Sequence, residues 1–516
     1  MRTFSRSELR FLLALTVLTI CIAAFPTVYA IVRTPESMVY SGRHLQNTGD
    51  YAVYFSQMEQ ARQGHLCFKN LYTSESHDAD ICNPVWYVLG TASRVAHVSV
   101  PIMFHLARLA FIPLFIYVLA RLIWMVYTDG RLRRLAMVLA VFAGGVVGYA
   151  KSTDGSAFHA LLFSPHLILS MIGIISIFLF VWKSIQTGKK SYALFAGGCA
   201  FLLFLFHPYH ISSVFGIYIL VWVISGITRM SNMKRFLTPM FILIMCSLPA
   251  IGYHWWFFST SPIGPLWLEQ SNVHMHTWMP WQIGIAFAPL YLFAGIGLVR
   301  WYRMSHLWFP LLCSWSIAPL ILMAVPWFFR MRMSGALSIG LSILAAEGLL
   351  AALPVLRRAY GTVASHALIV VFAIGVFSVS LTTWAYSVTA YAASVPLAYI
   401  PNDMVTMMSW YKNNASETDV LLSSWYTGNV IPAFTGRTVY GGHGVQTLHA
   451  QEKFDQINRF FGNMDESSQR QFFRDHGITY ILYSPFERQI GSRLPSVQYL
   501  EEVFHEGECT IFRVKQ

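Results

Sequence analysis

Long apolar runs separated by short polar tracts make up most of the chain between residues 10 and 391. Most are about as long as the roughly 20 helical residues that cross a bilayer. The pattern therefore predicts a polytopic α-helical membrane protein with about eleven transmembrane helices. The runs lie near residues 10–32, 101–127, 132–150, 161–183, 192–209, 211–228, 236–258, 282–299, 306–328, 334–353 and 365–391.

One polar segment, residues 33–100, interrupts this pattern after the first run and is too long for a bare connection. Within it, apolar residues recur at helical spacing just after Asp50, and Thr48 is a candidate cap for such a helix. We expect this helix to be amphipathic and to lie along the membrane interface, with a second one near 85–98. The apolar positions of the first are Tyr51, Tyr54, Phe55 and Met58.

A second exception begins near Pro401, where charged residues and glycine become frequent. Strand-like runs alternate there with helical stretches, which predicts an α/β domain. We therefore expect a transmembrane domain over 1–398, carrying the long loop 33–100, and a separate domain over 399–516. The expected strands are 420–423, 480–483 and 510–514, and the expected helices are 403–412, 449–461 and 465–475.

Composition and charge agree with a membrane location. Of the 516 residues, 55% are hydrophobic and 12% are charged, whereas soluble domains have about 25% charged residues. The net charge of +12 comes mainly from basic tracts in alternate connections between runs, so it indicates topology and no nucleic-acid partner. The positive-inside bias predicts a cytoplasmic N-terminus and an extracytoplasmic C-terminal domain. We expect this multi-pass protein to lie in the plasma membrane.

Two cysteines, Cys67 and Cys82, share the long outer loop. An oxidising compartment would allow a disulfide between them, and two free thiols are the alternative.

Asp50 is the first candidate for catalysis. It stands at the start of the predicted interfacial helix, where a lipid-linked substrate and a soluble acceptor could both reach a general base. The alternative is that Asp50 only caps its helix, since aspartate is favoured at helix starts. Asp154 follows in another outer loop, where the two carboxylates could share a proton or a divalent metal. A plain turn before Gly155 explains Asp154 equally well.

Two histidines and two arginines mark outer ends of predicted crossings. His207 and His210 flank Pro208, which breaks a helix, and could bond to substrate phosphate or to freed backbone groups. Interface anchoring is the alternative. Arg330 and Arg332 lie on the side that the positive-inside bias leaves poor in cations, and guanidinium matches phosphate geometry. Snorkelling to lipid headgroups would also explain both arginines.

In its order of elements the chain resembles the GT-C glycosyltransferases. These membrane enzymes, which use lipid-linked sugars, include protein O-mannosyltransferases, aminoarabinose transferases and oligosaccharyltransferases. Asp50 matches the catalytic aspartate of their first outer loop, Asp154 their second acidic loop residue, and Arg332 a position that holds donor phosphate. The resemblance implies an inverting hexosyl or pentosyl transfer from a polyprenyl-phosphate sugar to a glycan, lipid or protein acceptor.

The sequence departs from that family in two places. Gly49-Asp50 replaces the paired acids that are common in the first loop, and this leaves metal dependence open. The Trp-Trp-Asp motif of oligosaccharyltransferases is absent, which disfavours transfer of whole oligosaccharides to asparagine. The outer domain carries Tyr440-Gly441-Gly442-His443-Gly444, and His443 is a candidate for selecting the acceptor or covering the site. Its glycines could let backbone approach a ligand, or could form a plain turn.

Two other functions fit parts of the same pattern. A multi-helix transporter would place ionisable groups at mid-membrane, and Glu347 is the one acidic residue well inside a predicted crossing. A catalytically inactive GT-C-like scaffold would also keep the architecture. Loss of transfer on replacement of Asp50 would separate an enzyme from both.

Overall fold

The computed structural model describes residues 4–44, 48–146, 155–230, 233–265, 268–269, 280–325, 330–392, 398–491 and 497–515, without the side chains at 280, 330, 331, 391, 392 and 497. The chain divides into two compact units, described separately below. The first comprises Met1–Pro26, Leu106–Trp255 and Asn272–Tyr386, and the second comprises Thr27–His105, Trp256–Ser271 and Ser387–Gln516.

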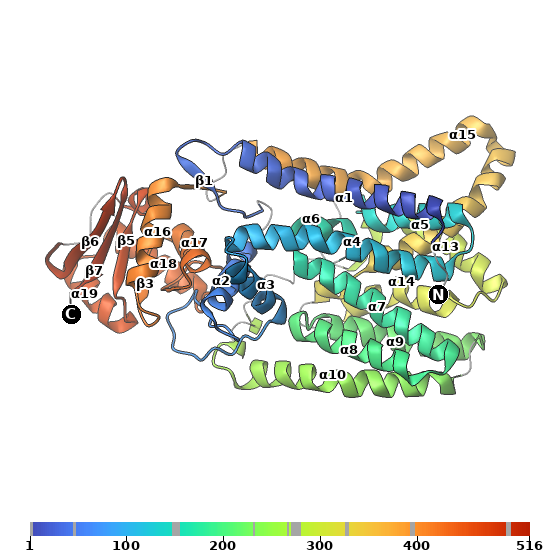
Figure 1. Ribbon diagram of the computed structural model, residues 1–516, viewed down its shortest axis with the longest axis horizontal. Helices are drawn as coiled ribbons and strands as arrows, with labels where there is room; N and C mark the ends of the chain where they lie inside the picture. The colour runs from blue at the N-terminus through green and yellow to red at the C-terminus, as the bar shows by residue number, and fades with distance from the viewer. Residues whose placement is uncertain are drawn as a thin grey trace. The chain divides into compact units, whose positions relative to one another are not determined.

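The first unit is built of helices, several of which run side by side (Figure 1). Helices α7 and α8 pack together, as do α9 and α14. Six helices in the described part of the chain are long and apolar enough to cross a membrane. Four of its helices, α1, α4, α10 and α15, extend into the second unit. The helices are α1 (Arg6–Val32), α4 (Val100–Val126), α5 (Gly130–Phe142), α6 (Ala157–Phe163), α7 (Pro165–Thr187), α8 (Lys190–Phe206), α9 (His210–Thr228), α10 (Lys234–Thr260), α12 (Pro280–Ala286), α13 (Ala288–Arg303), α14 (Phe309–Ala324), η1 (Arg330–Ser334) and α15 (Leu337–Ala392).

Several predicted crossings differ from these helices because glycine or proline interrupts them. Helix α5 ends at Phe142, and Gly145 adopts a φ of 94°, so the run over 132–150 is not one continuous helix. The run over 161–183 is divided between α6 and α7 at Pro165. The last two runs join in α15 across a kink at Gly361, whose φ is 81°. Because of these breaks, the number of membrane crossings stays a prediction.

Arg108, within the predicted crossing over 101–127, is buried and bonds to backbone carbonyls. Its Nη1 donates to the carbonyl oxygens of Ala23, Leu161 and Leu162 at 3.0, 3.2 and 2.9 Å. The last two belong to the C-terminal end of α6, where helix carbonyls lack partners within the helix. Arg108 thus stabilises the break between α6 and α7.

The second unit contains a five-stranded sheet in the order β4-β3-β5-β7-β6. Strand β3 is parallel to β4 and β5, whereas β7 is antiparallel to β5 and β6. A separate antiparallel pair joins β1 to β2. The bounds are β1 (Met38–Tyr40), β2 (Tyr399–Pro401), β3 (Val420–Leu422), β4 (Thr438–Val439), β5 (Tyr480–Tyr483), β6 (Leu500–Glu506), β7 (Cys509–Val514), α2 (Thr48–Gln63), α3 (Pro84–Val95), α16 (Asn402–Asn414), α17 (Trp425–Thr435), α18 (Ala450–Gly462), α19 (Glu466–His476), α20 (Pro485–Ile490) and η2 (Val497–Tyr499).

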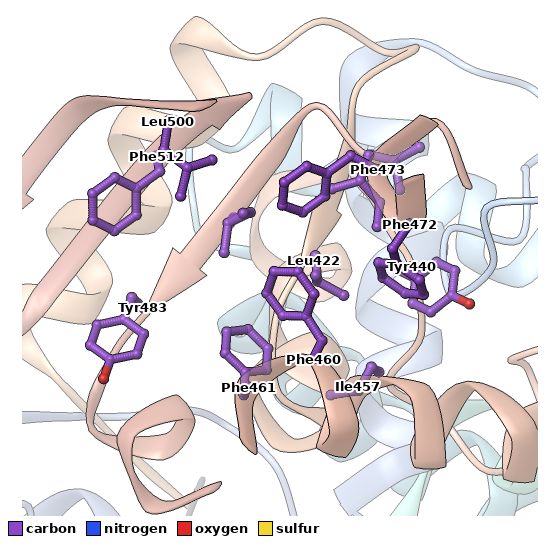
Figure 2. Packing of buried hydrophobic residues seen from close by; sticks show 13 residues of the cluster. Leu422, Tyr440, Ile457, Phe460, Phe461, Phe472, Phe473, Tyr483, Leu500 and Phe512 are labelled. Atoms are coloured by element: carbon purple, nitrogen blue, oxygen red, sulfur yellow. The ribbon is translucent and has the colours of Figure 1, made fainter. Parts of the chain in front are cut away.

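The core of this sheet lies under α18 and α19. Ile457, Phe460 and Phe461 recur at helical spacing on α18, and Figure 2 shows them directed toward Leu422 of the sheet. Phe472 and Phe473 of α19 belong to the same cluster. The predicted helices and strands of this region match α16, α18, α19, β3, β5 and β7 within about two residues, which confirms the predicted α/β character.

Helix α2 corrects one expectation. The sequence predicts an amphipathic helix, yet nine of its side chains are buried, and it packs against α3 and α17 (Figure 1). Its place at the membrane interface stays a prediction. Glu59, on its polar side, is buried and forms ion pairs with Lys412 and Arg62. The polar face is therefore covered by residues that follow much later in the chain. Within the same loop, Cys67 and Cys82 form a disulfide.

Candidate functional site

Asp50 lies in the first turn of α2, where the positive end of the helix dipole favours a carboxylate. Its side chain is 33% exposed, so part of it is accessible from outside the protein. Oδ1 lies 3.9 Å from Nε2 of His443, whose side chain is only 8% exposed. The structure thus brings together two residues that the sequence singled out separately.

The loop that carries His443 is held by hydrogen bonds of its own. Nδ1 of His443 accepts from the backbone N–H groups of Val445 and Gln446, each at 3.1 Å. The Thr447 hydroxyl accepts from the N–H groups of Gly442 and His443 and donates to the carbonyl of Tyr72. An Nδ1 that accepts two N–H groups carries no proton, so neutral His443 has its proton on Nε2.

Glycines allow the close approach of these segments. A Cβ at Gly49 would lie 3.1 Å from Nε2 of His443, and a Cβ at Gly442 would lie 2.2 Å from the carbonyl carbon of Gly428. Gly442 therefore lets the loop pack on the backbone of α17. The sequence suggested approach to a ligand or a plain turn for these glycines, whereas Gly442 instead allows close approach to another backbone segment.

A buried arginine in the segment between β1 and α2 bonds to α17. Arg43 is fully buried, and its Nη1 donates to Oδ1 of Asn429 at 3.1 Å while Nε donates to the Ser41 hydroxyl at 3.3 Å. Burial lowers the pKa of the Arg43 guanidinium to about 10, an effect that Tyr72 and Tyr40 partly oppose. The group therefore stays protonated at neutral pH and forms charged hydrogen bonds.

Glu487 stabilises the start of α17 and of α20. Its Oε1 accepts from the Ser424 N–H at 2.7 Å and from the Thr427 hydroxyl, and its Oε2 accepts from the Ser484 N–H at 2.9 Å. In Glu487→Gln, an amide NH₂ would face these buried donors. We expect the change to lower the free energy of unfolding by about 1–2 kcal/mol, measurable by thermal unfolding. Glu466→Gln, on the exposed surface of α19, is the control, and equal stability of the two variants would contradict this role.

A second cluster of polar residues lies in the first unit. His207 and His210 stand at the junction of α8 and α9 with ring centroids 4.6 Å apart, and His166 lies 5.6 Å from His207. The guanidinium carbon of Arg332 lies 5.9 Å from the centre of the Tyr209 ring. Nδ1 of His207 is buried and has no hydrogen-bond partner in the described part of the chain. Three imidazoles and one guanidinium offer hydrogen bonds and positive charge to an anion.

Glycine also makes room in this cluster. A Cβ at Gly335 would lie 2.4 Å from Cε1 of His210, so η1 and α9 approach closely only with glycine there.

Sequence reasoning missed His166, which follows Ser164 and Pro165. Its Nδ1 shares a hydrogen bond of 2.6 Å with the Ser164 hydroxyl. The break at Pro165 was the available signal, because it resembles the break at Pro208.

Solved structures of other proteins share this arrangement of elements. An archaeal oligosaccharyltransferase from Archaeoglobus fulgidus, in complex with an inhibitory peptide and a dolichol-phosphate, matches with a TM-score of 0.57 and 14% identity over 93% of this chain and 70% of its own. ArnT from Cupriavidus metallidurans, bound to undecaprenyl phosphate, matches with a TM-score of 0.51 and 12% identity over 99% and 98%.

A third structure, the arabinofuranosyltransferase AftD from Mycobacteria, matches with a TM-score of 0.51 and 13% identity over 100% of this chain and 40% of its own. The chain has the GT-C fold. No protein-family model and no curated protein sequence matches it.

The structure describes only part of the site that the resemblance to GT-C enzymes predicts. Asp154 lies outside the described residues, as does the side chain of Arg330. Asp50 and His443 are neighbours. His207 lies beside His210, and the guanidinium of Arg332 lies over the ring of Tyr209. No group of three or more metal-binding side chains is found among the described residues.

Proposed function

We propose that this membrane protein is an inverting glycosyltransferase that moves a sugar from a polyprenyl-phosphate donor to an acceptor hydroxyl. The observation that carries the proposal is the partly exposed carboxylate of Asp50 at the start of α2, beside a histidine N–H. The GT-C fold supports it, and two of the similar structures hold dolichol-phosphate or undecaprenyl phosphate.

The proposed reaction is a single displacement. The acceptor oxygen forms a bond to the anomeric carbon of the sugar, and the bond from that carbon to the phosphate oxygen breaks. The acceptor proton passes to Asp50, and the bond electrons leave with polyprenyl phosphate. A general base must lie within hydrogen-bonding reach of the proton it takes, which the partial exposure of the Asp50 side chain permits.

The departing phosphate gains negative charge and needs cationic or hydrogen-bonding partners. We assign this role to Arg332 with His207 and His210, and to Arg330 from its position in the sequence. The buried Nδ1 of His207 supports the assignment, because a buried polar atom is normally hydrogen-bonded in the working protein.

Topology and substrates follow from the sequence within this proposal. The N-terminus would be cytoplasmic, and the loop over 33–100 and the domain over 399–516 would face outward in the plasma membrane. Asp154 would complete the acidic pair with Asp50. The sugar would be a hexose or a pentose, and the acceptor would be a glycan, a lipid or a protein. Assays with different donors and acceptors would identify both.

The transporter alternative gains no support from Glu347. Its Oε1 lies 2.8 Å from Nε of Arg300, so this carboxylate takes part in an ion pair between α13 and α15. A paired carboxylate stabilises helix packing and does not by itself define an ion path.

The proposal is tested with purified protein and polyprenyl-phosphate donors that carry different radiolabelled sugars. Membrane extract supplies acceptors, and organic extraction separates the remaining donor from product. We expect label from at least one donor to move to product with wild-type protein. Absence of transfer from every donor, with protein that binds the lipid and unfolds cooperatively, would favour the scaffold alternative.

Gly335→Ala tests the phosphate-binding role of His210. The new Cβ would displace the imidazole, so we expect KM for the donor to rise about tenfold with little change in kcat. Gly198→Ala on α8 is the control, because nothing lies within 4 Å of its Cβ. A wild-type KM in Gly335→Ala would show that His210 does not bind the donor.

A further inference from the structure

We propose that His443 is a positioning residue for Asp50, donating the hydrogen bond from Nε2 that orients the carboxylate during transfer. The inference rests on the proposed function and adds a role for the outer domain in the chemistry. His443 and Asp50 lie in the same compact unit, with Nε2 and Oδ1 3.9 Å apart.

The hydrogen bonds of the loop fix what His443 can do. Because Nδ1 accepts from Val445 and Gln446, only Nε2 carries a proton in the neutral ring, and Nε2 is the nitrogen that faces Asp50. Protonation at Nδ1 would cost both of these bonds. His443 is therefore a neutral donor toward Asp50, and we assign the base to Asp50.

The separation of 3.9 Å exceeds a hydrogen bond by about 1 Å. Rotation of the Asp50 side chain can remove this difference, since that side chain is one-third exposed whereas His443 is almost completely buried. Catalytic hydrogen bonds are often long before substrates bind and shorten in the reacting complex. The rigid partner is thus the histidine, and the movable partner is the carboxylate.

Gly49 provides independent support for this arrangement. A Cβ at position 49 would lie 3.1 Å from Nε2 and 3.4 Å from Cδ2 of His443, so the imidazole fills the space beside a residue without a side chain. The imidazole of His443 therefore lies beside the position where the family often has a first acid.

A hydrogen-bond donor at one carboxylate oxygen holds the carboxylate of a base in one orientation while it receives the acceptor proton. Hydrogen bonds to charged groups are stronger than those between neutral groups. Removal of the Nε2 hydrogen-bond donor should lower kcat and leave KM for the polyprenyl-phosphate sugar nearly unchanged.

Two substitutions separate this role from the structural role of the ring. In His443→Asn, the amide oxygen can replace Nδ1 and accept from the same backbone N–H groups, as in an Asx turn, but the Nε2 donor is lost. In His443→Gln, the amide nitrogen reaches the place of Nε2, while the acceptor at Nδ1 is lost. His449→Asn is the matched control, an exposed histidine on the same segment with φ of 54°, which asparagine tolerates.

We expect kcat for transfer from the polyprenyl-phosphate donor to fall about tenfold or more in His443→Asn, with partial recovery in His443→Gln. In an Asp50→Asn background, His443→Asn should have little further effect on the residual rate. A wild-type kcat in His443→Asn would overturn the inference while leaving the proposed function intact. A greater loss in His443→Gln, accompanied by a lower melting temperature, would also overturn it in favour of a structural role. Failure of wild-type protein to transfer any sugar would overturn both proposals.

Discussion

Replacement of Asp50 by asparagine is expected to reduce the rate of sugar transfer roughly 10²- to 10⁴-fold, the range in which a general base contributes. Asparagine keeps the size of the side chain and its ability to hydrogen-bond at the start of α2. It cannot take the acceptor proton at neutral pH. Initial rates at saturating donor and acceptor measure the effect, and thermal unfolding verifies that the fold is retained.

Asp455→Asn is the matched control for Asp50→Asn. Asp455 lies on the exposed side of α18, where it accepts a hydrogen bond from Gln451. We expect this variant to transfer sugar at the wild-type rate. A rate for Asp50→Asn within about twofold of the wild-type rate would show that Asp50 only caps its helix.

Replacement of Arg332 by glutamine is expected to raise KM for the polyprenyl-phosphate donor roughly 10- to 100-fold. The guanidinium offers two parallel donors and a charge to phosphate, whereas the amide keeps one donor and no charge. The position of Arg332 beside the Tyr209 ring holds the guanidinium in place before the donor binds. KM is measured by varying the donor concentration at saturating acceptor.

Arg235→Gln, at the start of α10, removes a positive charge from an exposed site on the predicted cytoplasmic side. It controls for the general effect of charge on lipid binding. Equal values of KM in Arg235→Gln and Arg332→Gln would contradict a specific phosphate contact and favour snorkelling of Arg332 to headgroups.

The sequence predicted the elements whose signal is local. The strand at Tyr480–Tyr483 and the helix that begins after Asp50 follow from short-range periodicity, and the structure contains both. Gly361 and Pro165 also mark helix breaks locally. The apolar runs around them nevertheless predict two separate crossings on either side of Gly361 and one continuous crossing through Pro165. Hydrophobicity alone does not determine where a helix bends.

The sequence did not predict contacts between distant segments. Glu59 lies on the polar side of α2, and Lys412 pairs with it from α16. The contact between Asp50 and His443 was missed in the same way, since His443 reaches Asp50 from a loop almost 400 residues later in the chain. Periodicity along one helix contains no information about which later segment covers its polar face.

The most direct test of the central claim is the molar ratio of polyprenyl phosphate released to labelled sugar gained by the acceptor. Purified wild-type protein and the reactive donor are used, and lipid products are separated by chromatography. The proposed displacement predicts one polyprenyl phosphate released for each sugar transferred, and a rate of release roughly 10²- to 10⁴-fold lower in Asp50→Asn. Release of the lipid without transfer, or transfer at a near wild-type rate in Asp50→Asn, would contradict a glycosyltransferase that uses Asp50 as its base.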